Sequence, residues 1–155
     1  FRTVVKGDVA SHLSAMTMVL SYPGVPSIFA GDEIGLEGSW GEDGRRTINW
    51  EDRSQWDHSF MSKVQQLIAI RKGNDALING GLRWIAAEKD FILYLRESKK
   101  QSVLIFVSRT GVNAKIDLST LGLQVTKTLY GKDVSGSKFA IKSKEATQGI
   151  WVVTH

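Results

Sequence analysis

Two adjacent carboxylates, Asp32 and Glu33, are the residues best suited to chemistry by type and spacing. They follow the short apolar run 27–30, which a proline and a glycine bound. Such a run predicts a buried parallel strand over 27–31, and the carboxyl end of a parallel strand is a common place for catalytic groups. Glycosidic bonds are cleaved by two carboxylates about 5 Å apart, or about 6.5–9.5 Å apart when configuration inverts. Neighbours on a strand point to opposite faces, so this pair favours a structural role.

Charge is divided unevenly along the 155 residues. The net charge of +4 combines 5 basic and 8 acidic side chains in residues 1–56, a net −3, with 15 basic and 8 acidic side chains in residues 57–155, a net +7. A basic half can indicate nucleic-acid binding, but these lysines are scattered and have no aromatic residues interleaved with them. Solvated strand faces explain them better, so we expect no nucleic-acid partner.

Neither a metal nor a cofactor is expected. The three histidines, His12, His58 and His155, have no recognisable metal-binding spacing. The acidic residues of segment 42–52 do not match a calcium loop, and no phosphate-binding glycine motif or Gly-x-Ser-x-Gly elbow occurs. His12 lies near the apolar face of an expected helix, which favours a structural histidine.

The composition, 42% apolar and 23% charged, is that of an ordinary globular protein. The chain has no cysteine, no stretch of about 20 apolar residues and no signal-peptide pattern at its start. We therefore expect a cytoplasmic protein that has no disulfide and no membrane partner. The absence of a starting methionine is what a fragment would show.

Two amphipathic helices are expected in the first half of the chain. Apolar residues at helical spacing predict one over 8–22, with Asp8 or Ser11 as its N-cap. A second helix is expected over 56–73, where the preceding pattern Ser54-x-x-Asp57 resembles a capping box.

After residue 79 the pattern changes to short β-prone runs separated by turn residues, which indicates an antiparallel sandwich or barrel. The expected strands are Leu82–Ala87, Phe91–Arg96, Val103–Ser108, Lys115–Leu118, Val125–Tyr130, Lys138–Ile141 and Ile150–Thr154. The domain boundary is expected near residues 78–81, which divides the chain into residues 1–79 and 80–155.

Two short motifs carry a family resemblance. The first is Gly-x-Pro, four further residues and Gly-x-Glu, within 24–33, and the second is Asp-x-Arg-Arg followed by Trp, within 43–50. In this order they resemble the segment that closes the catalytic barrel of the α-amylase superfamily of glycoside hydrolases, and especially its α-glucosidase, maltodextrinase and neopullulanase-like members. The resemblance implies an α+β fragment. The last part of a (β/α)8 barrel, with two helices and one short strand, would occupy residues 1–79, and an antiparallel β-sandwich C-terminal domain would occupy residues 80–155.

The resemblance also implies which functional residues are present. The family's catalytic residues, two Asp and one Glu, lie on strands that would precede this chain, so we expect no catalytic residue here. Substrate contact is implied instead for Arg45, Asp43 and Trp40, in a long loop over 35–53 that is rich in glycine and charge. Guanidinium donors suit sugar hydroxyls, and a tryptophan ring can stack on a sugar. The alternative is that Arg45 pairs with Glu42 or Asp43 and that the tryptophan packs against the protein.

The sequence therefore predicts part of a retaining glycosidase that hydrolyses the α-glucosidic bonds of maltodextrin-like substrates. An α-glucan or malto-oligosaccharide would be the partner of the complete enzyme, and the chain by itself is expected to be inactive. The alternative is that the β region is a carbohydrate-binding or structural and interaction module without catalysis. A binding module would need exposed aromatic rings on one sheet face, and the candidates are Trp84, Tyr94, Tyr130 and Trp151.

Overall fold

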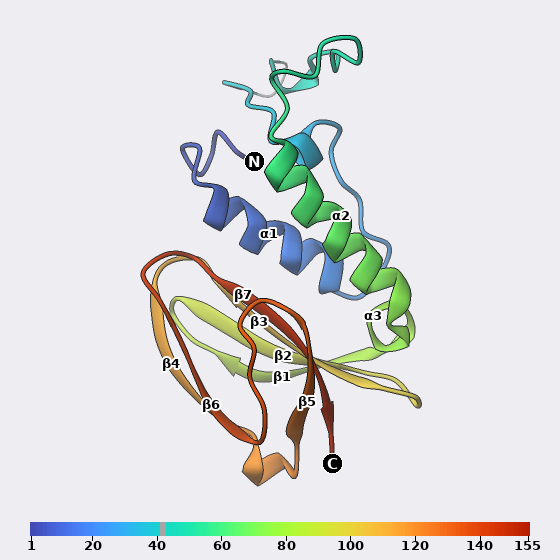
Figure 1. Ribbon diagram of the computed structural model, residues 1–155, viewed down its shortest axis with the longest axis vertical. Coiled ribbons are helices and arrows are strands. Elements are labelled where there is room, and N and C mark those ends of the chain that lie inside the picture. The colour runs from blue at the N-terminus through green and yellow to red at the C-terminus, as the bar shows by residue number, and fades with distance from the viewer. Residues whose placement is uncertain (41–42) are drawn as a thin grey trace.

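The computed structural model describes residues 1–40 and 43–155, with helices in the first half of the chain and strands in the second (Figure 1). The helices are α1 (Val9–Ser21), α2 (His58–Gly73) and α3 (Asp75–Asn79), and the 3-10 turns are η1 (Asp32–Ile34), η2 (Asp43–Arg45) and η3 (Ser119–Leu121). The strands are β1 (Gly81–Ala87), β2 (Phe91–Glu97), β3 (Ser102–Ser108), β4 (Val112–Asp117), β5 (Gln124–Tyr130), β6 (Lys138–Ser143) and β7 (Gln148–Thr154). Each expected strand of the β region is present, with its ends moved by a few residues at most.

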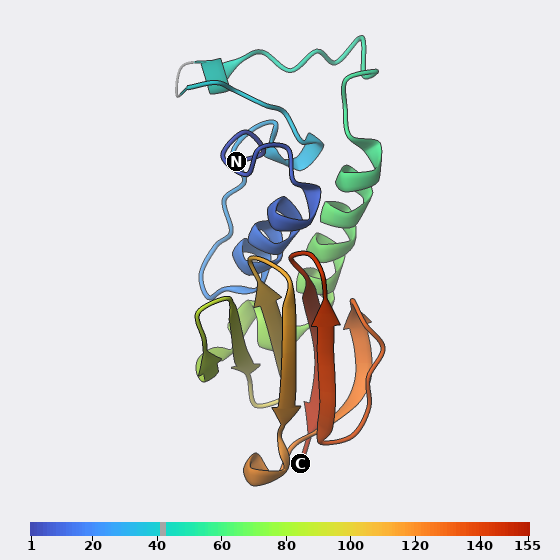
Figure 2. The same ribbon diagram turned by 90° about the vertical axis from the view of Figure 1, so that its left-hand side faces the viewer.

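The strands form two antiparallel sheets, as the spacing of the β-prone runs predicted. The larger sheet has the order β1-β2-β3-β7-β5, and β4 pairs with β6 in a smaller one (Figure 2). At the centre, β2 and β3 pair without interruption from Phe91↔Ser108 to Glu97↔Ser102. The outer pairs β1–β2 and β5–β7 both contain irregularities of register, which make the two edges poor templates for pairing with another sheet.

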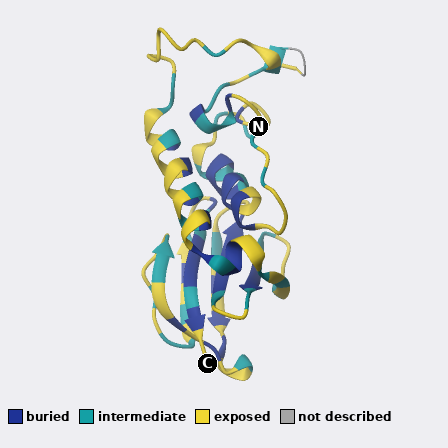
Figure 3. Ribbon diagram, turned by 90° about the vertical axis from the view of Figure 1, so that its right-hand side faces the viewer, coloured by how far each residue is buried: buried dark blue, intermediate teal, exposed yellow. Residues whose placement is uncertain are grey.

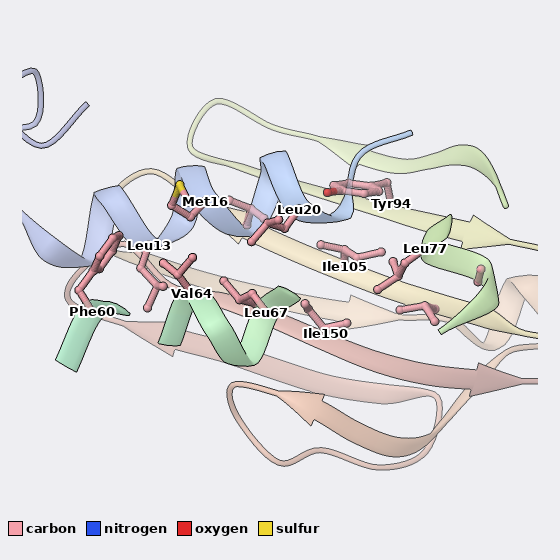
Figure 4. Packing of buried hydrophobic residues seen from close by; sticks show 13 residues of the cluster. Leu13, Met16, Leu20, Phe60, Val64, Leu67, Leu77, Tyr94, Ile105 and Ile150 are labelled. Carbon is pink, nitrogen blue, oxygen red and sulfur yellow. The ribbon is translucent and has the colours of Figure 1, made fainter. Parts of the chain in front are cut away.

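The central strand β3 separates two hydrophobic cores, because its side chains alternate between the faces of the sheet. Val103, Ile105 and Val107 pack with α1 and α2 on one face, and Figure 4 shows this helix-side core. Leu104 and Phe106 pack with β4 and β6 on the other face. A strand that is apolar on both faces is therefore covered on both, as its sequence predicted.

Capping side chains set where the two long helices begin. Asp8 caps α1 by accepting a hydrogen bond from the backbone N–H of Ala10 at 3.1 Å. Asp57 is the N-cap of α2 and accepts from the backbone N–H of Phe60 at 2.9 Å. The expected capping box that starts at Ser54 is therefore wrong, because Asp57 takes the N-cap position itself.

The short strand expected over 27–31 is also wrong. The segment is irregular up to the turn at residues 30–31, and Phe29 is 57% exposed instead of buried. A parallel strand exists only through hydrogen bonds to neighbouring strands, and no segment that the structure describes pairs with this one. The barrel to which this strand would belong remains a prediction.

Candidate functional site

The long loop between η1 and α2 extends beyond the ends of the helices (Figure 2). Residues 41–42 lie outside the described residues, and most of the rest of the loop is exposed (Figure 3). Trp50 is 60% exposed and lies edge-on against Trp56, with ring centroids 5.3 Å apart. Trp40 is 62% exposed and has no such ring neighbour among the described aromatic residues. An exposed tryptophan without ring contacts is available for a ligand.

A cavity of about 550 Å³ lies beside Trp40. Its walls come from residues within 1–4, 29–32, 36–40 and 43–46. Trp40 and Asp43 both line the cavity, so the structure brings together two of the three residues that the sequence suggested for substrate contact. Arg45 is not part of the lining. Arg46 is, although the sequence did not suggest it.

Asp43 is held by hydrogen bonds from two sides. The guanidinium of Arg46 donates from Nε to Oδ1 and from Nη2 to Oδ2, each at 2.7 Å. The backbone N–H of Ser39 donates to Oδ2, also at 2.7 Å. The Ser39 N–H first, and then the Arg46 side chain, hold the pKa of the Asp43 carboxyl below its ordinary value. The carboxylate is therefore ionised near neutral pH. An Asp-x-x-Arg spacing brings the two side chains together across one turn, so this spacing is the feature of the sequence that could have predicted the Asp43–Arg46 pair.

Arg45 lies on η2 and is exposed. The alternative pairing of Arg45 with Asp43 does not occur, because Asp43 pairs with Arg46 instead. Its pairing with Glu42 falls outside the described residues. Within the part of the chain that the structure describes, the Arg45 guanidinium makes no hydrogen bond or ion pair to a side chain.

The adjacent carboxylates Asp32 and Glu33 lie in η1 instead of at a strand end. The alternation of strand side chains therefore does not apply to them. Their side chains nevertheless contact different groups: Glu33 Oε2 accepts from the backbone N–H of Gly31 at 2.9 Å, whereas Asp32 Oδ1 accepts from the Phe1 ammonium at 3.0 Å and lies 3.8 Å from His12 Nε2. Glu33 closes its own turn, which is a structural role.

His12 is fully buried and stacks on Phe60, with ring centroids 4.3 Å apart. Arg2 Nε donates to His12 Nδ1 at 3.1 Å, so the neutral ring carries its proton on Nε2. That Nε2 atom has no hydrogen-bond partner among the described residues. Burial, and then the nearby Arg2 charge, lower the pKa of His12 to about 4. These contacts make His12 a structural histidine, as its position in the sequence predicted.

The aromatic residues of the β region do not form an exposed row. Tyr94 and Trp151 are fully buried, Tyr130 is half-buried and Trp84 is 47% exposed. Trp84 packs edge-on against Tyr94, with centroids 5.4 Å apart. Within residues 1–40 and 43–155, no group of three or more His, Cys, Asp or Glu side chains could hold a metal ion. No helix in the same ranges has the length and apolar character needed to cross a membrane.

The fold and the loop define an α+β unit that has an antiparallel β region and a cavity lined by a tryptophan, a carboxylate and a guanidinium. Known enzymes show similar sequences and folds. The cyclomaltodextrinase of Thermoanaerobacter pseudethanolicus is 28% identical over 145 residues, which are 94% of this chain and 23% of that enzyme. Neopullulanase 2 of Thermoactinomyces vulgaris is 29% identical over 152 residues, or 92% of this chain and 25% of that enzyme.

A crystal structure of the debranching enzyme from Nostoc punctiforme, soaked with acarbose, superposes with a TM-score of 0.79 and 27% identity, over 97% of this chain and 30% of that one. No protein-family model matches the sequence. The relatives and the fold show that the chain is similar, over nearly its whole length, to a C-terminal portion of enzymes of the α-amylase superfamily of glycoside hydrolases. The chain spans about a quarter of the length of the two relatives, 23% and 25%.

Proposed function

We propose that this chain is part of a retaining glycoside hydrolase that cleaves the α-glucosidic bonds of maltodextrin-like glucans. The similar cyclomaltodextrinase, neopullulanase and debranching enzyme support the substrate class by their names. The observation that carries the proposal is the cavity beside the loop, which an exposed tryptophan and an ionised carboxylate line. Sugar recognition uses this combination, because a ring covers the apolar face of a sugar and charged acceptors bind its hydroxyls.

In this proposal Trp40 stacks on a glucose ring, and Asp43 accepts a hydrogen bond from a hydroxyl of the same glucan. Asp43 receives three hydrogen bonds from Ser39 and Arg46, and a carboxylate has about four lone-pair positions, so one remains for a ligand. Arg45 lies outside the cavity lining, and its exposed donors would reach a sugar that extends along the loop.

The carboxylates that cleave the bond would come from outside this chain. The support is that the Glu33 carboxylate accepts from Gly31 of its own turn and that Asp32 accepts from the Phe1 ammonium, so these two neighbours do not converge on one glycosidic oxygen. In the complete enzyme, residues 1–79 would close the catalytic barrel. The β region of residues 80–155 would shield the outer sides of α1 and α2.

The direct test is steady-state kinetics on the complete enzyme that contains this chain. With maltotriose, Arg45→Ala should lower kcat/KM about tenfold, because charge-assisted hydrogen bonds contribute about 1.5–3 kcal/mol. Trp40→Ala should also lower kcat/KM, because the sugar loses the apolar face of the ring. Arg53→Ala is a matched control, since Arg53 is an exposed loop arginine that stacks on Trp56 at 5.0 Å and lies outside the cavity. Unchanged kinetics in both site variants, with normal folding, would remove the loop from the substrate site.

A second test concerns the 155-residue chain alone. Purified, it should release no glucose from maltotriose above a buffer blank, because groups that act together in catalysis fail together when any is missing. Turnover that disappears in Glu33→Gln would show that the catalytic carboxylate is in this chain, and it would overturn this part of the proposal.

A further inference from the structure

We infer that Arg46 is a positioning residue of the substrate site, acting through Asp43 instead of by contact with the glucan. The inference rests on the proposed function and adds to it a residue that keeps the loop in its binding shape. Arg46 and its neighbour Arg45 would then have different tasks: Arg46 would hold the loop, and Arg45, which lies outside the cavity lining, would contact only a sugar that extends along the loop.

The first observation is the geometry of the ion pair. Two parallel hydrogen bonds of 2.7 Å join the fork of the Arg46 guanidinium to both oxygens of Asp43. This arrangement fixes the plane of the carboxylate as well as its position, which a lysine cannot do because its ammonium is a point charge. The Asp43 side chain is 22% exposed, whereas that of Arg46 is 59% exposed, so the carboxylate is the better enclosed partner.

The second observation is the contact of Asp43 with the part of the loop that carries Trp40. Asp43 accepts from the backbone N–H of Ser39, the residue before Trp40, at 2.7 Å. The backbone N–H of Gly44, the residue after Asp43, donates to the carbonyl oxygen of Trp40 at 3.0 Å. The orientation of Trp40 therefore depends on where Asp43 is held, and Arg46 holds it.

The third observation is how closely the two sides of this turn approach each other. A Cβ atom on Gly38 would lie 2.7 Å from the Cα atom of Gly44, so the two backbones leave no room for a side chain between them. Such close contact requires a fixed loop shape. The hydrogen bonds from Ser39 to Asp43 and from Gly44 to Trp40 lie at this turn. Arg46 adds its two hydrogen bonds to the same Asp43 carboxylate.

The kinetic test uses a double-mutant cycle in the complete enzyme, with maltotriose as substrate. Arg46→Met and Arg46→Lys should each raise KM about fivefold or more and leave kcat within about threefold, because lost positioning weakens binding. In an Asp43→Ala background, Arg46→Met should cause no further rise in KM, because Arg46 acts through that carboxylate. Arg53→Met is the matched control and should leave KM unchanged.

Three kinetic outcomes would overturn the inference. Additive effects of Arg46→Met and Asp43→Ala would mean that Arg46 contacts the sugar directly. Full activity of Arg46→Lys would mean that only its charge matters. A lower kcat at unchanged KM, together with a lower melting temperature, would mean that the substitution reduces the folded fraction and that the role is merely structural.

A spectroscopic measurement on the 155-residue chain separates this inference from the proposed function. The Nε–H of Arg46 should give a slowly exchanging ¹H–¹⁵N signal that Asp43→Ala abolishes and Arg45→Ala leaves in place. If the signal is unchanged in Asp43→Ala, the ion pair does not form in solution and the inference fails, whatever the kinetics show. If the signal behaves as expected but none of the Trp40, Arg45 and Arg46 variants alters KM, the loop does not bind the substrate, and both proposals fail together.

Discussion

Arg71 and Arg96 donate hydrogen bonds to consecutive carbonyl groups at the C-terminal end of the same helix. Arg71 of α2 donates to Leu20 O at 2.8 Å, and Arg96 of β2 donates to Ser21 O at 2.5 Å. The last turn of α1 contains no basic residue of its own. Two guanidiniums from other elements therefore satisfy the exposed carbonyls and complement the negative end of the helix dipole. Burial lowers the pKa of both side chains, so their charges are held at an energetic cost.

Arg96→Met should destabilise the chain by at least about 2 kcal/mol, because the carbonyls of Ser21, Gly80 and Gly81 lose a buried charged donor. Arg83→Met is the matched control. Arg83 also lies on the sheet, but its bidentate ion pair with Glu97 is largely exposed. Exposed ion pairs contribute less than about 1 kcal/mol to the free energy of unfolding. Urea unfolding of both variants measures the difference. Equal losses would contradict a special role for Arg96.

The pH dependence of stability should contain a contribution from His12. Its pKa is about 4 in the folded chain, against an ordinary value of 6.5 that the unfolded chain would have. As pH falls below 6.5 the unfolded state takes up a proton that the folded state does not. The contribution of His12 to the free energy of unfolding is therefore fully present above pH 6.5. It is lost as the pH falls towards 4, at about 1.4 kcal/mol per pH unit. The charged groups that act on the ring are Arg2, Asp32, the N-terminal ammonium of Phe1 and Asp57.

The measurement is the free energy of unfolding in urea at pH 7, 6 and 5. His12→Asn keeps an acceptor for Arg2 but does not titrate, so its stability should fall less steeply than that of the unaltered chain over this range. His58→Asn, at an exposed histidine of α2, is the matched control substitution. Identical slopes for His12→Asn and the unaltered chain would contradict the assignment of His12 as a buried neutral base.

Gly149→Ala should destabilise the β region, because a Cβ atom on Gly149 would lie 2.0 Å from the Trp151 ring. Trp151 is fully buried, and its indole N–H donates to Lys132 O at 2.9 Å, so the ring has little freedom to move. Overpacking of this kind costs about 1–3 kcal/mol, which corresponds to a fall of several degrees in Tm. Gly81→Ala, at a glycine with no atom within 4 Å of the added Cβ, should leave Tm nearly unchanged. Similar Tm values for the two variants would contradict this packing.

The sequence predicted the strands of the β region well, because each is a short β-prone run that finds its partners among the other runs of the same region. Alternation and turn residues identify such strands, and the doubly apolar pattern of β3 identified the strand that is covered on both faces. The strand expected over 27–31 failed for the opposite reason. An isolated apolar run does not show whether another segment will supply the hydrogen bonds that make it a strand.

For the candidate site, the residue types in the sequence indicated which loop carries the site, but they did not indicate the role of each residue in it. Trp40 and Asp43 line one cavity as the motifs suggested, whereas Arg45 does not. The two arginines differ in sequence only in their spacing from Asp43, and the backbone turn of η2 brings the one three residues away, Arg46, to that carboxylate. The buried arginines Arg71 and Arg96 were missed for a similar reason. Their acceptors are main-chain carbonyl groups, which every residue has, so the sequence does not indicate which carbonyls will bind an arginine.

The helix-side core has a consequence for the order of events during protein synthesis. Leu13 of α1 and Ile150 of β7 belong to the same cluster, although nearly the whole chain separates them. The apolar face of α1 leaves the ribosome long before the last strand that covers it has been made. Contacts between such distant segments form slowly, and unfinished chains expose apolar surface meanwhile. A nascent chain that stalls before β7 would therefore leave this core incomplete, with part of its apolar surface exposed to chaperones or to aggregation.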